Sequence, residues 1–183
     1  AMTNLYLLYL KETNYLNALD IIEKLLNSNF NSDKIIKDKA FILYKLKRYK
    51  ESINVCKSFL KLNNDLNFLN ILGLNYLDQN KFSESEKIFK KALKIDNKNS
   101  SILNSLGRMY HEKRDNKNAE YYLLKAYKLN QNSYEIINNL AGFYREEGMY
   151  NKSIGLYLDA LKINPKNPTI IGNLAKAYFD INQ

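Results

Sequence analysis

The chain has 183 residues, a formal net charge of +9 and 45% hydrophobic residues, a composition that excludes a disordered chain. Six glycines and two prolines are too few for a protein built from many β-turns, so helices are favoured. A single cysteine, Cys56, excludes an intramolecular disulfide. No apolar run approaches the roughly 18 residues of a membrane span, and no signal peptide is recognisable, so we expect a cytoplasmic protein.

A repeat of 34 residues organises the chain and is most regular from Leu66 onward. With Leu66 as position 1, position 8 is Gly73 and position 11 is Tyr76, and a small residue and a tyrosine return at these positions in each following repeat. Counted backward from Leu66, the step is 33 residues. The predicted repeats are residues 1–32, 33–65, 66–99, 100–133 and 134–167, followed by a half repeat over 168–183.

Each repeat has the hydrophobic period of two helices. In the fifth repeat, Leu140, Ala141 and Tyr144 share a face of a first helix. Ser153 and Tyr157 share a face of a second helix, and small residues let the two helices approach closely. One such pair cannot bury its apolar face alone, so we expect neighbouring repeats to stack.

The ends of the helices also carry signals. Gly148 is expected to end the first helix of the fifth repeat, and Pro165 follows the second helix. Tyr6 is large where a small residue is expected, which predicts an irregular first repeat. The half repeat supplies only one helix, and its many apolar side chains predict self-association or continuation into a longer protein.

This pattern resembles the tetratricopeptide repeat (TPR) family over nearly the whole chain. The resemblance implies an all-α fold, a right-handed α-solenoid of stacked antiparallel helix pairs (TPR superhelix), formed by residues 1–183 as one domain. It also implies that the first helix of each pair lines a concave groove. The residues that carry the resemblance in the third repeat are Leu72, Gly73, Tyr76, Phe82, Ser85, Phe89 and Ala92.

No constellation of residues indicates catalysis. Cys56 falls at a core position of the repeat, and His111 is the only histidine, so we expect neither a metal site nor a cofactor. Phosphate-binding glycine loops and nucleophile motifs are absent from the sequence. Glu146 and Glu147 lie at a predicted helix end and do not form an acid/base pair. We therefore predict that the protein is not an enzyme.

Basic residues exceed acidic ones in the first two thirds of the chain, and there are fifteen tyrosines. Both features suit nucleic acid as well as an acidic protein partner. About half of the tyrosines recur at two scaffold positions of the repeat, however, and the lysines between Lys87 and Lys94 lie on a second helix, which faces outward in the family. We therefore do not expect a nucleic-acid partner.

The polar positions of the first helices are left as the candidate groove for a partner. One amide can donate to a peptide carbonyl and accept from its N–H, while Arg108, Arg145 and Lys176 would attract acidic side chains. Phe41 and Leu74 would provide apolar anchors. The predicted groove residues are Lys37, Phe41, Leu74, Asn104, Arg108, His111, Asn138, Asn139, Arg145, Asn173 and Lys176.

Two ways in which TPR proteins bind peptides can be tested on these residues. Members that clamp a pair of carboxylates need asparagine at position 9, where the second repeat has Phe41, so we reject that function although Lys37 fits. Members that hold an extended peptide use asparagine at position 6, which Asn139 and Asn173 match.

We therefore predict a non-catalytic protein–protein interaction scaffold that binds a partner peptide or helix in its concave groove. One alternative is a regulatory or substrate-docking arm of a larger enzyme of the glycosyltransferase or sulfotransferase type. A further alternative is a homotypic assembly module, with self-association through residues 168–183.

Overall fold

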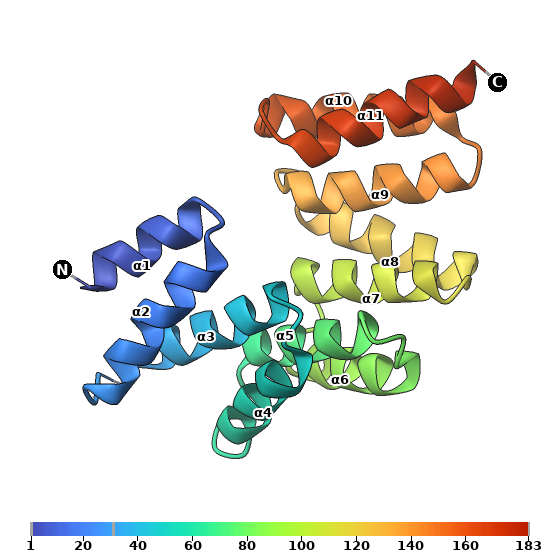
Figure 1. Ribbon diagram of the computed structural model, residues 1–183. Helices are drawn as coiled ribbons and strands as arrows, with labels where there is room; N and C mark the ends of the chain where they lie inside the picture. Colours follow the sequence, from blue (N-terminus) through green and yellow to red (C-terminus); the bar gives the residue numbers. More distant parts are fainter. Residues whose placement is uncertain (1, 31, 183) are drawn as a thin grey trace. The chain divides into compact units, whose positions relative to one another are not determined.

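The computed structural model describes residues 2–30 and 32–182, and these residues form eleven α-helices and no strand (Figure 1). The predicted all-α solenoid of paired helices is confirmed. The helices are α1 (Met2–Lys11), α2 (Tyr15–Asn27), α3 (Asp33–Lys45), α4 (Tyr49–Leu60), α5 (Leu66–Leu77), α6 (Phe82–Ile95), α7 (Ser100–Glu112), α8 (Asn116–Leu129), α9 (Tyr134–Glu146), α10 (Tyr150–Ile163) and α11 (Pro168–Ile181).

Side-chain caps fix where many of these helices begin. Asp65 Oδ1 accepts hydrogen bonds from the backbone N–H groups of Asn67 and Phe68, at 2.7 and 3.1 Å. Asn99 Oδ1 accepts from the N–H of Ile102 at 3.1 Å. The first turn of a helix has no internal partner for these N–H groups, so a preceding Asp, Asn or Ser stabilises the start of the helix.

The turn between the two helices of a repeat has the same backbone geometry five times. Thr13, Lys47, Asn80, Arg114 and Gly148 occupy this turn with φ of 56°, 59°, 57°, 65° and 76°. The N–H of the residue that follows each of them bonds to the carbonyl five residues earlier, at 2.8–2.9 Å. Gly148 thus ends α9 as predicted. Asn80 is a residue type that adopts the left-handed conformation readily, while Thr13, Lys47 and Arg114 adopt it in spite of a cost of about 1 kcal/mol or more.

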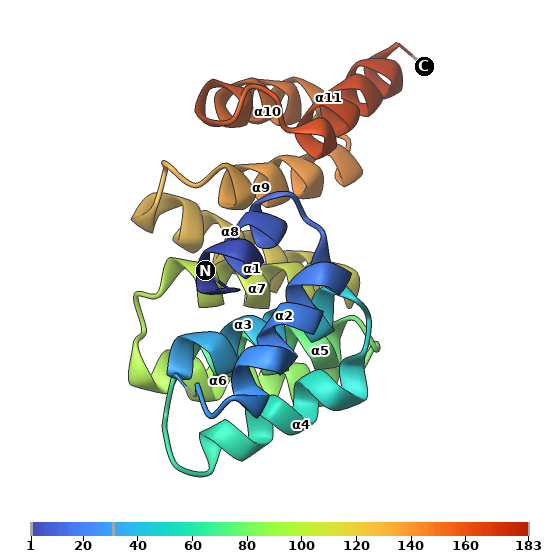
Figure 2. The ribbon, with the colours of Figure 1, turned by 60° about the vertical axis from the view of Figure 1, so that its left-hand side comes forward.

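The helices group into two compact units, Ala1–Ile88 and Phe89–Gln183, which we call unit 1 and unit 2, and the boundary falls within α6. In unit 1, α1 to α5 pack in chain order and α3 also contacts α5 (Figure 2). Tyr6, the large residue at a position where a small one was expected, is fully buried in the core of unit 1. Its hydroxyl donates to Asp38 Oδ2 at 3.3 Å.

A buried polar network lies at the centre of unit 1. Asn75, on α5, is fully buried, and its Nδ2 donates to Ser52 Oγ and to the carbonyl of Ile71, both at 2.8 Å. Ser52 Oγ in turn donates to the carbonyl of Ala40 at 2.8 Å. Asn75 Oδ1 is buried without a hydrogen-bond partner. Cys56 is also fully buried, and burial raises the pKa of its thiol to about 12, so its predicted packing role is confirmed.

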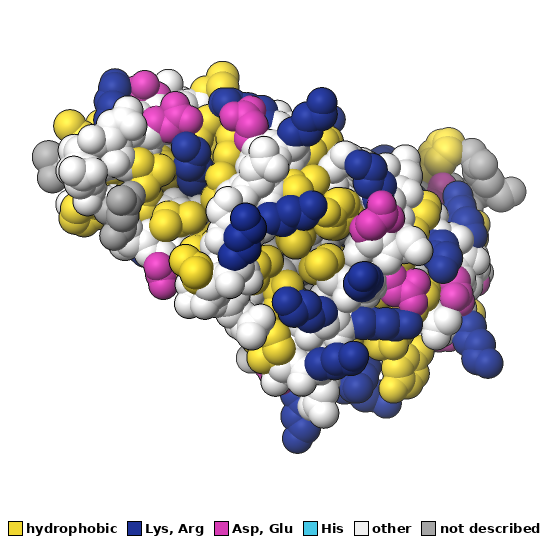
Figure 3. Space-filling model, turned by 90° about the horizontal axis from the view of Figure 1, so that it is seen from below, with side chains coloured by type: hydrophobic (Ala, Val, Ile, Leu, Met, Phe, Trp, Pro, Cys, Tyr) yellow, Lys and Arg dark blue, Asp and Glu magenta, His cyan; other side chains and the backbone are white. Residues whose placement is uncertain are grey.

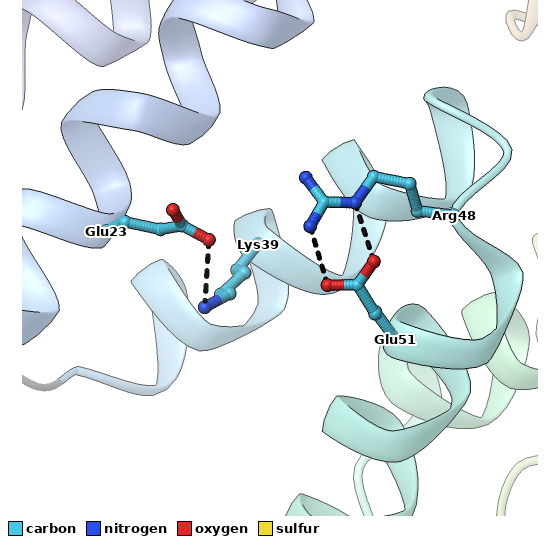
Figure 4. A network of polar contacts seen from close by, with 4 residues as sticks. All are labelled: Glu23, Lys39, Arg48 and Glu51. Carbon is cyan, nitrogen blue, oxygen red and sulfur yellow. Dashed lines mark hydrogen bonds and ion pairs between the residues drawn. The ribbon is translucent and has the colours of Figure 1, made fainter.

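Two groups of charged residues on the surface of unit 1 are drawn in Figure 4. Lys39 Nζ lies 3.5 Å from Glu23 Oε1 and joins α3 to α2. Arg48 donates from Nε and Nη2 to the two carboxylate oxygens of Glu51 at 2.7 and 2.6 Å, and this hydrogen bonding lowers the pKa of Glu51. Both pairs are solvent-exposed in part, so they add little to stability.

In unit 2, α7 to α11 pack in chain order, and the first helices α7, α9 and α11 also contact one another in succession. Close approach of helices is allowed by small residues, as predicted. A Cβ atom on Gly107 would lie only 2.7 Å from Leu123 Cγ on α8. Ser153 Oγ, on α10, donates to the carbonyl of Ala141 on α9 at 2.7 Å. The row of first helices positions the candidate site.

Candidate functional site

Four asparagines form two hydrogen-bonded pairs across neighbouring first helices of unit 2. Asn139 Nδ2, on α9, donates to Asn104 Oδ1 on α7 at 3.0 Å. Asn173 Nδ2, on α11, donates to Asn138 Oδ1 on α9 at 3.1 Å. In each pair, the asparagine at position 6 of one repeat donates to the asparagine at position 5 of the repeat before it. All four side chains are half-buried, so they remain in contact with the surface.

The asparagine pairs change what the sequence suggested about these amides. We expected each asparagine to offer its whole amide to a partner, but each pair uses one N–H donor and one carbonyl acceptor internally. An amide has two N–H donors and one oxygen with two lone pairs, so each pair keeps hydrogen-bonding capacity for a further group. Pairing also restricts the rotamers of these side chains, which lowers the entropy lost when a partner binds.

Arg108, Arg145 and His111 of the candidate site each lie against a carboxylate of the same unit. Arg108 Nε donates to Glu112 Oε1 at 2.9 Å, and Arg145 Nε lies 3.6 Å from Asp180 Oδ2. His111 Nε2 lies 3.2 Å from Glu146 Oε2 and links α7 to α9. The sequence pattern had suggested that the arginines are available to an acidic partner, but in the structure each already contacts a carboxylate.

These ion pairs and the asparagine pairs surround a pocket of about 190 Å³. Six of its lining residues were predicted from the sequence, while Asn104 borders the pocket only through its bond to Asn139, and Lys176 is exposed on α11 without lining it. The pocket is lined by Arg108, His111, Leu123, Asn138, Asn139, Gly142, Phe143, Arg145, Glu146, Tyr157 and Asn173.

Tyr157 is one of the lining residues that the sequence pattern did not assign to the groove. It occupies a core position of the second helix and is only 1% exposed, yet it lines the pocket. A Cβ atom on Gly142 would lie 3.5 Å from the Tyr157 hydroxyl, so α9 comes close to that oxygen at this glycine. Burial raises the pKa of Tyr157, while the nearby Arg145 charge opposes the rise, so the phenol is protonated at neutral pH.

The three predicted groove residues of unit 1 are partly packed. Phe41 is half-buried, and its ring lies edge-on to Tyr15 at 6.4 Å, with Lys45 Nζ 5.3 Å from its centroid. Leu74 is half-buried against the core cluster around Phe68. Lys37 is half-buried on α3. The two apolar side chains therefore contribute to the core as well as to the surface.

Comparison with known protein families places the chain in a class of repeat proteins. Tetratricopeptide repeats match residues 66–99, 100–133 and 143–182, which together make up more than half of the chain. The chain belongs to the tetratricopeptide repeat family. Repeats of this family generally serve as scaffolds for protein–protein interaction, and its members are typically non-catalytic. No curated protein matches the chain significantly.

Solved structures share the fold. A thermophilic TPR protein of Thermus thermophilus is 20% identical with a TM-score of 0.88, and the alignment covers 98% of this chain and 100% of that one. A tetratricopeptide repeat protein from Parabacteroides merdae is 13% identical with a TM-score of 0.64, covering 99% of this chain and 72% of that one. MamA AMB-1 is 17% identical with a TM-score of 0.56, covering 80% of this chain and 81% of that one.

Membrane spans and metal sites are not found among residues 2–30 and 32–182. In this part of the chain no helix is long and apolar enough to cross a membrane. Within the same residues, no group of three or more His, Cys, Asp or Glu side chains lies close enough to hold a metal ion. On the face drawn in Figure 3, lysine and arginine side chains outnumber acidic ones, and hydrophobic and uncharged side chains lie between them.

Proposed function

We propose that unit 2 binds a peptide segment of a protein partner over the pocket between α7, α9 and α11. The observation that carries this proposal is the set of two asparagine pairs, which hold four amides at the surface of one row of helices. A peptide in extended conformation has alternating N–H and C=O groups, and an amide can bond to both. Scaffolding of this kind agrees with the family to which the chain belongs.

The ion pairs of the pocket refine the kind of peptide that would bind. An acidic partner side chain would have to compete with Glu112 for Arg108 and with Asp180 for Arg145. Hydrogen bonds between the partner backbone and the amides would then supply most of the affinity. The arginines would favour a partner carboxylate only where that carboxylate replaces Glu112 or Asp180. Arg145 is the better candidate for such an exchange, because its 3.6 Å contact with Asp180 is longer than a good hydrogen bond.

The test uses peptides selected on the full chain from a random display library, with affinities measured by isothermal titration calorimetry. The double variant Asn139→Ala, Asn173→Ala should weaken binding about five- to a hundredfold, since each lost hydrogen bond contributes about 0.5–1.5 kcal/mol. The matched control is Asn97→Ala, Asn151→Ala, which removes two exposed amides outside the pocket and should leave binding unchanged. Equal affinities for both double variants would exclude the amide surface as the binding site.

The other functions considered from the sequence remain predictions. A docking arm of a larger enzyme would be revealed by the reading frame beyond Gln183. Nucleic-acid binding would give a gel shift that weakens steeply with salt. Self-association through residues 168–183 concerns the exposed face of α11 and would appear as a dimer in sedimentation.

A further inference from the structure

Exposed aliphatic side chains recur at one position of the repeat in unit 2. Ile95, Leu129 and Ile163 follow one another at steps of 34 residues, and they are 47%, 44% and 42% exposed. Each is the last residue of a second helix, namely α6, α8 and α10. These second helices run in the same direction, so their last turns lie at one edge of unit 2, where the loops after α8 and α10 are also found (Figure 1). This edge therefore presents a row of aliphatic side chains to solvent.

Lysines accompany the aliphatic side chains along this edge. Lys94, Lys128 and Lys162 come directly before them in the sequence, and all three are exposed. Lys91 and Lys125 lie one turn earlier on α6 and α8. The helix dipole favours a lysine in the last turn of a helix, which is a structural reason for the first three lysines. It gives no reason for the two earlier lysines or for the exposed aliphatic residues.

The lysines of α6 and α8 have no internal partner of opposite charge. Within residues 2–30 and 32–182, no carboxylate forms an ion pair with any of the four lysines of α6 and α8 named above. Lys162 of α10 differs, because its Nζ lies 2.7 Å from Asp159 Oδ1. Asp159 stands where α6 and α8 have Lys91 and Lys125. The excess of positive charge therefore belongs to α6 and α8, in contrast to the arginines of the pocket, which already contact carboxylates.

An exposed tyrosine adds to this surface on α8. Tyr121 is 56% exposed, and Lys125 Nζ lies 5.9 Å from the centroid of its ring. The ring lies edge-on to Tyr122, which packs in the core cluster around Ala126 together with Leu93 of α6. The last turns of α6 thus lie close to α8. We call the following residues the α6–α8 surface: Lys91, Lys94, Ile95, Tyr121, Lys125, Lys128 and Leu129.

We propose that the α6–α8 surface binds peripherally to an anionic lipid bilayer. Lysine carries a compact charge on a flexible chain, so it can reach the phosphate and carboxylate groups of anionic lipids. Aliphatic side chains and tyrosine suit the boundary between headgroups and acyl chains, where an apolar body is buried and a polar tip stays wet. The surface combines both kinds of side chain on two neighbouring helices.

The aliphatic residues favour a bilayer over other anionic partners. A single-stranded nucleic acid stacks its bases on aromatic rings, and Ile95 and Leu129 would add little to such stacking. A partner helix lays its apolar face into a continuous apolar groove, whereas lysines separate the apolar side chains of this surface. A bilayer receives each apolar side chain independently of the others, so it accepts this interspersed pattern.

The α6–α8 surface is separate from the proposed peptide site. None of its residues lines the pocket, and Leu123 is the pocket residue that α8 supplies. A helix turns by about 100° per residue, which places Leu123 roughly opposite Tyr121 and Lys125. Unit 2 could therefore hold a partner peptide at one face and a bilayer at another. Lipid binding does not depend on the peptide site, so the two proposals can fail independently.

The first test is cosedimentation of the full chain with vesicles of phosphatidylcholine that contain about one third phosphatidylserine. We expect saturable binding to these vesicles, and binding at least about tenfold weaker to phosphatidylcholine alone. The double variant Lys94→Gln, Lys128→Gln should weaken binding by about tenfold or more, because each lysine near the anionic surface adds to the attraction. The matched control Lys152→Gln, Lys176→Gln removes the same charge from the first turn of α10 and from α11, and it should weaken binding less than about threefold.

The second test reports insertion of the aliphatic residues. The chain has no tryptophan, so Leu129→Trp introduces the only one, and its emission should shift to shorter wavelength when the anionic vesicles are added. Thr169→Trp, at an exposed position of α11, should show no shift. The double variant Ile95→Ser, Leu129→Ser should weaken vesicle binding by about fivefold or more, because less apolar surface leaves water.

Absence of binding to the anionic vesicles, or equal weakening by the two lysine double variants, would overturn the proposal. So would equally tight binding to a single-stranded oligonucleotide or a glutamate-rich peptide that Ile95→Ser, Leu129→Ser leaves unchanged, because the surface would then serve another anion. The substituted side chains are exposed, so the variants should keep the melting temperature of the unaltered chain. If the loss of Lys94 and Lys128 lowers it, Lys91→Gln, Lys125→Gln tests the same charge one turn away from the helix ends.

Discussion

Unit 1 and unit 2 place their amides in opposite ways. In unit 1, Asn75 is fully buried and bonds to Ser52 and to a backbone carbonyl. The residues 34 and 68 positions later in unit 2, Met109 and Phe143, are equally buried but apolar. Unit 2 has its amides at the surface instead, where Asn139 bonds to a neighbour across repeats. The same repeat pattern therefore holds a buried amide in unit 1 and paired amides at the surface of unit 2.

This difference shows which part of the repeat is free to change. The backbone hydrogen bonds are satisfied inside each helix, so the packing of first against second helix does not require any particular side chain at the Asn75 position. A polar side chain there needs partners, because burial without a hydrogen bond is costly. Ser52 is that partner, so an asparagine at position 75 depends on the serine at position 52.

The largest effect is expected at the close helix contact of unit 2. Gly107→Leu should lower the free energy of unfolding by about 3 kcal/mol, because a Cβ atom would lie 2.7 Å from Leu123 Cγ and 3.0 Å from its backbone nitrogen. Gly155→Leu is the matched control, since nothing lies within 4 Å of a Cβ atom there. It should raise stability by about 0.5–1 kcal/mol in chemical denaturation. Similar losses for both would show that the contact is not tight.

The next effect compares the serines of the two units. Ser52→Ala should cost about 2 kcal/mol, because the hydroxyl both donates to Ala40 and accepts from Asn75, leaving buried groups unpaired. Ser153→Ala removes a hydroxyl that donates to the carbonyl of Ala141 and should cost about 1 kcal/mol. Urea denaturation of the two variants measures the difference. Equal costs would mean that the hydrogen bond from Asn75 adds nothing to the stability that Ser52 provides.

A smaller change in stability is expected when the buried Asn75 of unit 1 is replaced by an apolar residue, as at the corresponding positions of unit 2. Asn75→Leu removes two hydrogen bonds but also removes Oδ1, which is buried without a partner. The two contributions oppose each other, so stability should change by less than about 1 kcal/mol. In the double variant with Ser52→Ala, the loss should be smaller than the sum of the single losses. Strict additivity, measured by a double-mutant cycle, would contradict the network.

The smallest effect concerns Asp38, whose pKa is raised by burial, although Lys37 and the hydrogen bond from Tyr6 oppose the rise. The folded state then holds the proton more tightly than the unfolded chain. Protonation stabilises the fold below the unfolded pKa, and this stabilisation is lost as the pH rises through the folded pKa. Asp38→Asn keeps an acceptor for Tyr6 and should be slightly stabilising at about pH 7 but not at about pH 3. Thermal unfolding at both values checks this, and an equal gain at the two pH values would contradict it.

Much of the fold was predictable from single residues, because the repeat places them in equivalent surroundings. Gly148 marked the end of α9, and the core position of Cys56 was recognised from its place in the repeat. The turns at Lys47 and Arg114 carried no such signal, since neither residue favours the left-handed conformation. The repeat imposes this conformation on them, because the following N–H reaches a carbonyl of the first helix.

The candidate site was predictable only in part, because spacing shows which side chains share a face and not what they bond to. Asn138, Asn139 and Asn173, which the spacing of the repeat assigned to the first helices, line the same pocket. Their pairing depends on the distance between neighbouring first helices, which the sequence does not state. The same holds for Arg145, whose contact with Asp180 joins two helices in successive repeats.

The sequence by itself determined the repeat, the helix pairs and the faces of each helix, because these follow from periodicity and from the small residues that allow helices to approach. Tertiary structure alone decided which polar groups are already paired and which surfaces are open. The amides of unit 2 bond to one another because stacking brings α7, α9 and α11 side by side. On α11, Ile171 and Tyr178 are exposed, although the corresponding residues of α9, Ile137 and Tyr144, are buried.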